Sequence, residues 1–150
     1  MNLFFDTSVL VKYFHVEKGT ERVTALIHNA DNNVFVLELA RIEMMSAFFR
    51  KYRDHVIDND QLELAIAGFE VEFRTFKVEP LNQLVACEAE DLLKKYGKSE
   101  GLRTLDALHL GSFRLLAEED WVFVSADEVL CHTAQLEGFR VINPCNEEPT

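Results

Sequence analysis

Three aspartates stand where charged residues are unusual, and their surroundings point to chemistry. Asp6 follows the apolar run of residues 3–5, and Asp127 comes within three residues of the apolar run 121–124. Asp106 lies inside a segment that is otherwise almost entirely apolar. Because charged side chains are almost never fully buried unless they are paired, each of these positions needs either a structural partner or a function.

Simple structural roles would also explain two of these aspartates. Asp6 would cap a helix that begins directly after it, although Thr7 or Ser8 can equally accept the free backbone N–H groups of such a helix. Asp106 would form a helix-surface ion pair with Arg103, three residues earlier, and such a pair is worth about 0.2–0.5 kcal/mol. The rest of the chain decides between these roles and a shared site.

A shared site would hold a hard divalent cation. Two carboxylates about 4 Å apart repel by roughly 4 kcal/mol at an effective dielectric constant of 20, so a cluster of them takes up protons or binds a cation. Ligand sets made only of oxygen select Mg²⁺, with Mn²⁺ as a plausible substitute, over zinc. Mg²⁺ held by a few carboxylates and several waters is the usual arrangement for phosphate chemistry.

The elements that must position these side chains alternate between strand and helix. Apolar runs predict strands at residues 3–5, 34–37, 75–78, 121–124 and 139–142. Helical periodicity and capping residues predict helices at residues 8–14, 20–27, 40–52, 62–76, 81–96, 102–116 and 127–135. This alternation predicts an α/β fold with a parallel sheet. Ligands of such sheets bind beyond the carboxyl ends of the strands, where Asp6 and Asp127 are expected.

Two of the predicted helices carry informative patterns. In the helix over 40–52, three apolar residues recur at i, i+3 and i+7 and predict its core stripe, namely Ile42, Met45 and Phe49. A second side of the same helix presents Glu43, Ala47 and Arg50, because a spacing of seven returns nearly to the same angle. The helix over 102–116 is apolar around nearly its whole circumference, which predicts that it is largely buried.

Length, charge and cysteine content limit the function classes. The 150 residues suit one domain, and the net charge of −11 repels nucleic acid. A nucleic-acid partner must therefore meet a local basic patch or a bound cation. Three cysteines without a CxxC pair make disulfides and zinc improbable and favour a reducing, cytoplasmic location. We expect no secretory signal and no membrane span, since no run approaches about 20 apolar residues.

Five short segments occur in an order that is informative as a set: FDTSVL at residues 5–10, ARIE at 40–43, LDALHL at 105–110, VSAD at 124–127 and GFRVINP at 138–144. Together they resemble the PIN-domain family, in particular the toxin ribonucleases of VapC type from bacterial and archaeal toxin–antitoxin pairs. The resemblance implies a three-layer α/β/α sandwich around a central parallel sheet. It places one nuclease domain over residues 1–145 and an acidic C-terminal tail over 146–150.

The resemblance also implies the site residues and the partners. The catalytic and metal-binding acids would be Asp6, Glu43, Asp106 and Asp127, with Glu38 as the competing choice for the second acid. Ser125 occupies the hydroxyl position just before the last acidic motif, and Ser8 is a second auxiliary hydroxyl. The family implies an RNA substrate, a cognate antitoxin protein and frequent homodimers.

The predicted function is that of a Mg²⁺-dependent endoribonuclease in which a metal-activated water attacks the scissile phosphate. Contacts to the RNA backbone are expected from basic residues near the acids, although each of them has a solvated helix face as its alternative role: Lys12, Arg41, Arg50, Lys51 and Arg53. His109 follows Asp106 by one turn, but no second histidine stands at ligand spacing. We therefore predict a structural, hydrogen-bonded histidine at position 109.

Two other functions compete with a ribonuclease. A PIN-fold domain that has lost catalysis and serves only as a scaffold or binding partner should lack some of the acidic positions, whereas this chain fills all four. A phosphatase of the haloacid-dehalogenase type also begins with an aspartate at a strand end. It needs a second aspartate two residues later, where this chain has Ser8.

Overall fold

A computed structural model describes residues 1–147. The elements in this part of the chain follow one another as β1 (Asn2–Phe5), α1 (Thr7–Phe14), α2 (Thr20–His28), β2 (Asn33–Leu37), α3 (Leu39–Arg53), α4 (Asn59–Phe73), β3 (Lys77–Glu79), α5 (Gln83–Tyr96), α6 (Thr104–Leu116), β4 (Val122–Val124), α7 (Glu128–Leu136) and β5 (Arg140–Ile142). Every predicted strand and helix is present, with ends displaced by a few residues.

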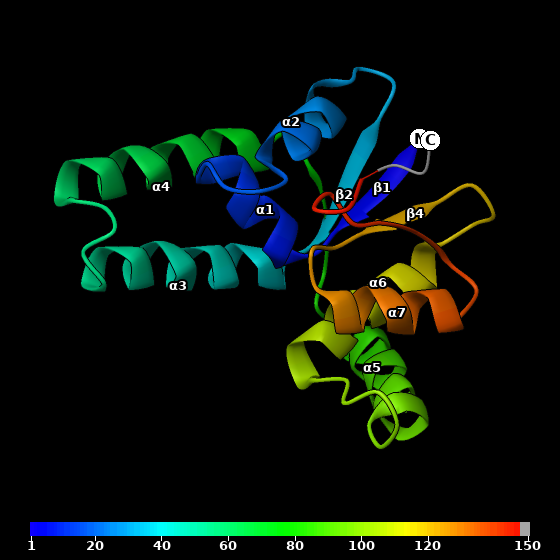
Figure 1. Cartoon of the computed structure of the whole chain (residues 1–150). Helices are drawn as coiled ribbons and strands as arrows, with labels where there is room; N and C mark the ends of the chain where they lie inside the picture. The colour runs from blue at the N-terminus through cyan, green and yellow to red at the C-terminus, as the bar shows by residue number, and fades with distance from the viewer. Residues whose placement is uncertain (148–150) are drawn as a thin grey trace.

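The strands form one sheet in the order β3-β2-β1-β4-β5, and each neighbouring pair is parallel. Successive residues of β1 point to opposite faces. Leu3 and Phe5 therefore join the core under α1, α2, α3 and α4, whereas Phe4 joins the core under α5, α6 and α7. The helices thus cover both faces of the sheet (Figure 1), which confirms the predicted α/β/α layers.

The middle strand, β1, is where the order of the sheet reverses. The chain leaves β1 toward β2 on one side and returns much later through β4 on the other side. In parallel sheets of this kind the crevice for ligands opens beyond the carboxyl ends of the two strands that flank such a point. The residues that follow β1 and β4 are Asp6 and the segment that leads to Asp127, and the backbone N–H of Asp6 bonds to the carbonyl of Val124 at 3.2 Å.

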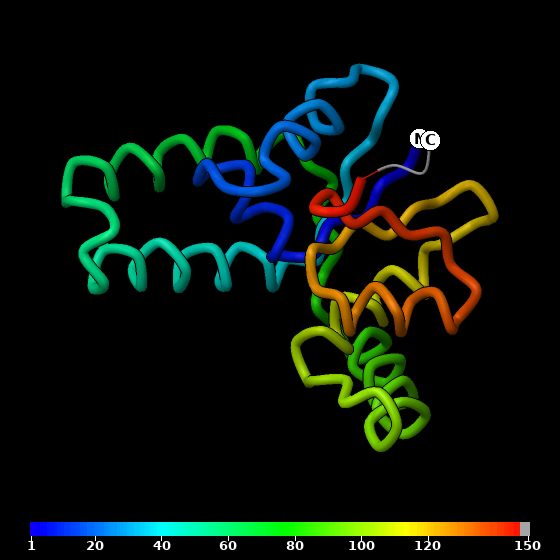
Figure 2. Tube along the Cα trace, viewed as in Figure 1, coloured from blue at the N-terminus to red at the C-terminus, as the bar shows by residue number. Residues whose placement is uncertain are grey.

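Helices α3 and α4 run antiparallel and extend as an arm away from the sheet (Figures 1 and 2). Asp58 begins α4 with a capping box, in which its side chain and that of Gln61 each accept a backbone N–H.

The predicted core stripe of α3 is wrong at two of its three positions, since only Met45 packs against the core. Ile42 is 66% exposed and Phe49 is 45% exposed, whereas Met44 and Phe48 are buried against the core. Both sides of this helix are apolar at helical spacing, so periodicity alone selects neither. Contact with α1 and α4 decides the orientation, and an apolar strip of α3 stays at the surface.

Helix α6 is less buried than its sequence predicts. Ala107, Leu110 and Phe113 lie in the core, but Leu105 and Leu115 are nearly half exposed because the neighbouring elements cover one side of the helix. In the predicted tail, the carbonyl of Asn146 accepts a hydrogen bond from Arg22 at 2.8 Å, and residues 148–150 lie outside the described part. Within residues 1–147 every helix is too short or too polar to cross a bilayer.

Candidate active site

A hollow of about 320 Å³ lies beyond the carboxyl ends of β1 and β4, and we refer to it as the acidic hollow. Other hollows on the surface are of similar volume, so its chemistry rather than its size distinguishes it. The four predicted acids all line it, together with two arginines and several smaller or neutral side chains: Asp6, Thr7, Ser8, Val11, Glu43, Ala47, Arg50, Arg103, Asp106, His109 and Asp127.

Asp6 is only 3% exposed and both of its oxygens are engaged. Oδ1 accepts hydrogen bonds from Ser8 Oγ at 2.6 Å and from the backbone of Val9 at 3.4 Å, and Oδ2 accepts one from Ser125 Oγ at 2.8 Å. Burial raises the pKa of Asp6 to about 6, despite the opposing effects of the charge of His109 and of the two hydroxyl groups. The carboxyl group is held in place without being neutralised.

The bond from Val9 makes Asp6 itself the cap of α1. The predicted capping by Thr7 or Ser8 is wrong, because Thr7 is already helical and Ser8 turns toward Asp6. Capping does not remove Asp6 from the site, since a cap uses one oxygen and the residue still lines the acidic hollow.

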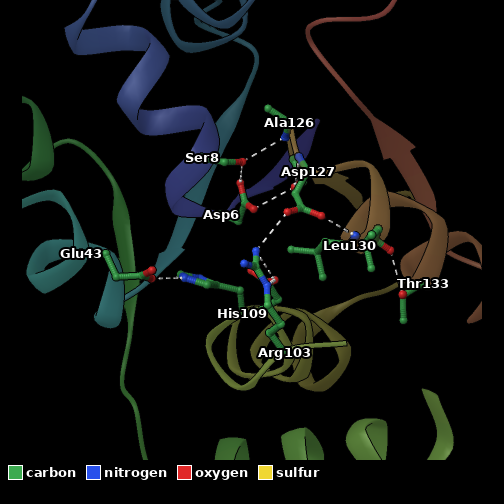
Figure 3. Close-up of polar contacts among 12 residues, drawn as sticks. Asp6, Ser8, Glu43, Arg103, His109, Ala126, Asp127, Leu130 and Thr133 are labelled. Carbon is green, nitrogen blue, oxygen red and sulfur yellow. Dashed lines mark hydrogen bonds and ion pairs between the residues drawn. The ribbon is translucent and has the colours of Figure 1, made fainter. Parts of the chain in front are cut away.

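Asp127 repeats this arrangement at the end of β4. Its Oδ1 caps α7 by accepting the backbone N–H of Leu130 at 2.9 Å. Ser125 Oγ accepts the N–H of Asp127 at 3.1 Å while donating to Asp6. Figure 3 shows the same linkage around Ser8, whose Oγ accepts the N–H of Ala126 at 3.0 Å. The two predicted hydroxyl residues therefore tie the ends of β1 and β4 together.

Asp106 reaches the acidic hollow from the first turn of α6. Burial and the nearby charge of Asp127 raise its pKa, against the opposing effect of Arg103. The Nη2 of Arg103 lies 3.3 Å from Asp106 Oδ2 and 3.4 Å from Asp127 Oδ2. The predicted pair between Arg103 and Asp106 is thus present, but it extends to a second carboxylate and belongs to the site.

Glu43 comes from α3 on the opposite side of the hollow, where Figure 3 shows it facing His109. Its Oε1 accepts a hydrogen bond from Thr7 Oγ1 at 2.9 Å and lies 2.5 Å from His109 Nε2. Burial alone would raise the pKa of Glu43, but the hydrogen bond and charge of His109 and the bond from Thr7 outweigh it and lower the pKa. Since Nε2 faces a carboxylate oxygen, we assign its proton to this nitrogen.

His109 is buried, as predicted for a structural histidine, but it is only partly hydrogen-bonded. Its Nδ1 is enclosed without a partner among residues 1–147. Glu38, the alternative second acid, lies elsewhere, because its Oε1 accepts the backbone N–H of Leu81 at 2.8 Å. Of the two glutamates, Glu43 is the one that lines the acidic hollow.

Of the five basic residues proposed for the RNA backbone, Arg50 lines the acidic hollow. Lys12 pairs with Glu17 at 3.2 Å, and the guanidinium of Arg41 lies 5.0 Å from the ring centre of Phe73. Lys51 and Arg53 line other hollows.

Three contacts of the site were not predicted from the sequence: that of Arg103 with Asp127, and those of Thr7 and His109 with Glu43. A signal was present for two of them, because Arg103 and His109 stand three residues before and after Asp106 and so share its side of the helix.

The donor set fits a hard divalent cation by its chemistry. Four carboxylates from separate elements line the hollow, and oxygen is the ligand that Mg²⁺ prefers. In the described residues, no three acidic, histidine or cysteine side chains converge closely enough to coordinate one ion. The Arg103 guanidinium lies between two of the carboxylates, so coordination requires these side chains to move together.

A protein-family model covers the helices and strands that form the sheet and the acidic hollow. The family model described as PIN domain matches residues 3–142, which is nearly the whole chain. The protein belongs to the PIN domain family. The family predicted from the five sequence segments is thereby confirmed.

Solved structures with low sequence identity share the PIN fold. FitAcB from Neisseria gonorrhoeae is 15% identical, with 95% of this chain and 97% of that chain aligned and a TM-score of 0.68. VapBC-1 from nontypeable Haemophilus influenzae is 13% identical over 97% and 100%, with a TM-score of 0.66. A toxin–antitoxin complex from Klebsiella pneumoniae is 17% identical over 95% and 97%, with a TM-score of 0.63. No curated protein matches the sequence significantly.

Proposed function

We propose that this PIN domain is a Mg²⁺-dependent endoribonuclease and the toxin of a toxin–antitoxin pair. The observation that carries the proposal is the gathering of four carboxylates from four elements around one hollow at the point where the sheet order reverses. Membership of the PIN domain family supports it. The same membership argues against a phosphatase of the haloacid-dehalogenase type. That alternative was already disfavoured because position 8 holds a serine and not the aspartate that such a phosphatase needs.

In this proposal the four acids, the two serines and Arg50 have defined tasks. Asp6, Glu43, Asp106 and Asp127 hold the cation, for which Mn²⁺ is a plausible substitute. When bound, the cation supplies charge stabilisation at the phosphate and a lower pKa for water. Ser8 and Ser125 fix the carboxylate of Asp6 through its two oxygens.

The Arg50 guanidinium lies on the α3 side of the same hollow and is placed to hold an RNA phosphate. A local cation of this kind is needed because the protein carries a net charge of −11.

The partners are proposed on separate grounds. The related Klebsiella structure is described as a toxin–antitoxin complex, and we propose an antitoxin for this chain by analogy. The predicted homodimer and cytoplasmic location stay predictions. The surface available to a protein partner includes the exposed apolar strip of α3, to which Ile42, Phe49 and Tyr52 contribute.

The test is cleavage of labelled RNA by purified protein in Mg²⁺ and in EDTA, compared among the wild type, Asp6→Asn, Asp106→Asn and Asp91→Asn. Asp91 is an exposed aspartate that pairs with Arg114 in the last turn of α6, and neither residue lines the acidic hollow. Asp91→Asn therefore removes the same charge without changing the site. We expect Mg²⁺-dependent cleavage by the wild type and the control. Each site variant should lose at least about 100-fold, the upper range for residues that only support a metal ligand.

A different result identifies the alternative function. If the wild type cuts no RNA in Mg²⁺ or Mn²⁺ while it binds a protein partner, the domain is an inactive PIN-fold binding protein. If the wild type and both site variants cut equally, the acidic hollow is not the active site.

A further inference from the structure

Arg103 is a charged side chain of the acidic hollow to which the proposed function gives no task. It precedes α6 at the capping position but makes no side-chain capping bond. Its guanidinium reaches instead across the hollow toward Asp127 (Figure 3) and contacts Asp106 on the way. The one arginine thus partly neutralises two carboxylates that come from different elements.

The oxygens that Arg103 contacts are the ones that a cation would need. Asp127 uses Oδ1 to cap α7, which leaves Oδ2, and Arg103 lies on Oδ2. It likewise lies on Oδ2 of Asp106. A cation held by Asp106 and Asp127 through these oxygens would take the place of the guanidinium.

Arg103 is held loosely enough to leave. Its contacts of 3.3 and 3.4 Å are longer than the roughly 2.7–2.9 Å of strong charge-assisted hydrogen bonds. Its side chain is 76% exposed, and exposed ion pairs contribute little because water screens them. A divalent cation brings twice the charge to the same oxygens and competes favourably.

We propose that Arg103 is a resident counter-ion which a divalent cation displaces, and that the released guanidinium then binds a phosphate of the RNA at the mouth of the hollow. The proposal rests on the proposed function. Arg50 lines the hollow from α3, in the helical layer on the other face of the sheet from α6. With Arg103 released, two planar guanidinium groups would hold the phosphodiester chain from both sides, in the geometry that suits bidentate contact.

The first test measures Mn²⁺ binding to RNA-free protein by electron paramagnetic resonance of the free ion. The variant is Arg103→Gln, and its matched control is Lys94→Gln. Lys94 is 75% exposed and pairs with Glu90 on α5, so the two substitutions remove the same charge at the same exposure. We expect Arg103→Gln to bind Mn²⁺ about fivefold more tightly than the wild type, from the loss of two exposed ion pairs. Lys94→Gln should bind like the wild type.

The second test measures the affinity for a fluorescent single-stranded RNA by anisotropy. Ca²⁺ replaces Mg²⁺ because it takes the same oxygen ligands in a looser geometry, and gel electrophoresis confirms that the RNA stays intact. With Ca²⁺, Arg103→Gln should bind RNA about fivefold more weakly than the wild type and the control. Without a divalent ion the wild type and Arg103→Gln should differ by less than about twofold, because Arg103 is then occupied by the carboxylates.

The outcomes separate the two halves of the proposal from the proposed function. Equal or weaker Mn²⁺ binding by Arg103→Gln overturns the counter-ion role. Tighter Mn²⁺ binding with unchanged RNA affinity overturns the phosphate contact alone. A wild type that binds no Mn²⁺ overturns the metal-dependent function itself.

Discussion

Asp6 and Glu137 are both enclosed carboxylates, but their surroundings shift their pKa values in opposite directions. Glu137 ends α7 with a side chain that is 7% exposed, and it meets Lys95 Nζ at 2.6 Å, Tyr96 Oη at 2.5 Å and Arg114 at 3.4 Å. Burial would raise its pKa, but these partners outweigh burial and lower it. Asp6 is 3% exposed and is contacted by hydroxyl and amide groups, and its pKa rises to about 6.

The difference is the one expected between a structural carboxylate and the functional carboxylate that we propose at Asp6. The partners of Glu137 join α5, α6 and α7, so its charge contributes to the packing of one helical layer. Asp6 is positioned as firmly, yet its charge is left for something outside the chain to neutralise. Burying a charge without a counter-ion is costly, and proteins accept that cost mainly at functional sites.

The largest expected effect is a gain in stability from removing the charge of Asp6. At pH 7.5 in EDTA, Asp6→Asn should raise the free energy of unfolding by about 3 kcal/mol, because a pKa raised by about two units costs roughly that much in the charged form. The amide can still accept from Ser8 and from the backbone of Val9. Urea denaturation measures the change, and a loss of stability would mean that Asp6 is a structural carboxylate like Glu137.

Removing the charge of Glu137 should change the free energy of unfolding in the opposite direction. Glu137→Gln should lower the free energy of unfolding by about 2 kcal/mol, since it removes the charged acceptor shared by Lys95, Tyr96 and Arg114. The same urea titration measures it, with Glu90→Gln as control because Glu90 is an exposed glutamate paired with Lys94. If Glu137→Gln is as stable as the control, the cluster around Glu137 is not a stabilising network and the contrast with Asp6 fails.

The fold was more predictable from the sequence than the site was. Alternation of strand and helix predicted the parallel sheet, and Asp6 and Asp127 followed from their places at strand ends. The orientation of α3 was not predictable, because Phe48 and Phe49 are both apolar and only contact with α1 and α4 selects Phe48 for the core.

The contacts within the site depend on long-range geometry. Glu43 meets Thr7 and His109 from positions far away in the chain, and no local pattern encodes that meeting. The reach of Arg103 to Asp127 is likewise visible only once α6 and α7 are in contact in the fold.

A smaller effect of about 1 kcal/mol is expected from pH. The folded-state pKa of Asp6 is raised, so its stabilising proton uptake is complete below the unfolded pKa and is lost as the pH rises through about 6. On acidification from pH 7.5 to 5 in EDTA, the wild type should therefore gain stability relative to Asp6→Asn. Glu137 has a lowered pKa, so its contribution should be lost only as the pH falls below the ordinary glutamate range. An unchanged difference between the wild type and Asp6→Asn across this range would contradict the raised pKa.

Addition of Mg²⁺ should give a comparable gain that depends on Asp6. A ligand present at ten times its dissociation constant stabilises the folded state by about 1.4 kcal/mol. At pH 7.5 the wild type and Glu137→Gln should both gain stability with Mg²⁺, and Asp6→Asn should gain much less. Thermal melting with and without Mg²⁺ measures these gains. Equal gains in all three proteins would place the ion outside the acidic hollow.

A nuclease role of the acidic hollow is tested by the rate of RNA cleavage as a function of Mn²⁺ concentration. The wild type, Asp6→Asn and Glu137→Gln are compared at a temperature where all three are folded. We expect saturable, metal-dependent cleavage by the wild type and by the less stable Glu137→Gln, and loss of at least about 100-fold in the more stable Asp6→Asn. Because the inactive variant is the most stable of the three, unfolding cannot explain its inactivity. Cleavage by Asp6→Asn at the wild-type rate, or cleavage that needs no divalent ion, would contradict the claim that the acidic hollow is a metal-dependent nuclease site.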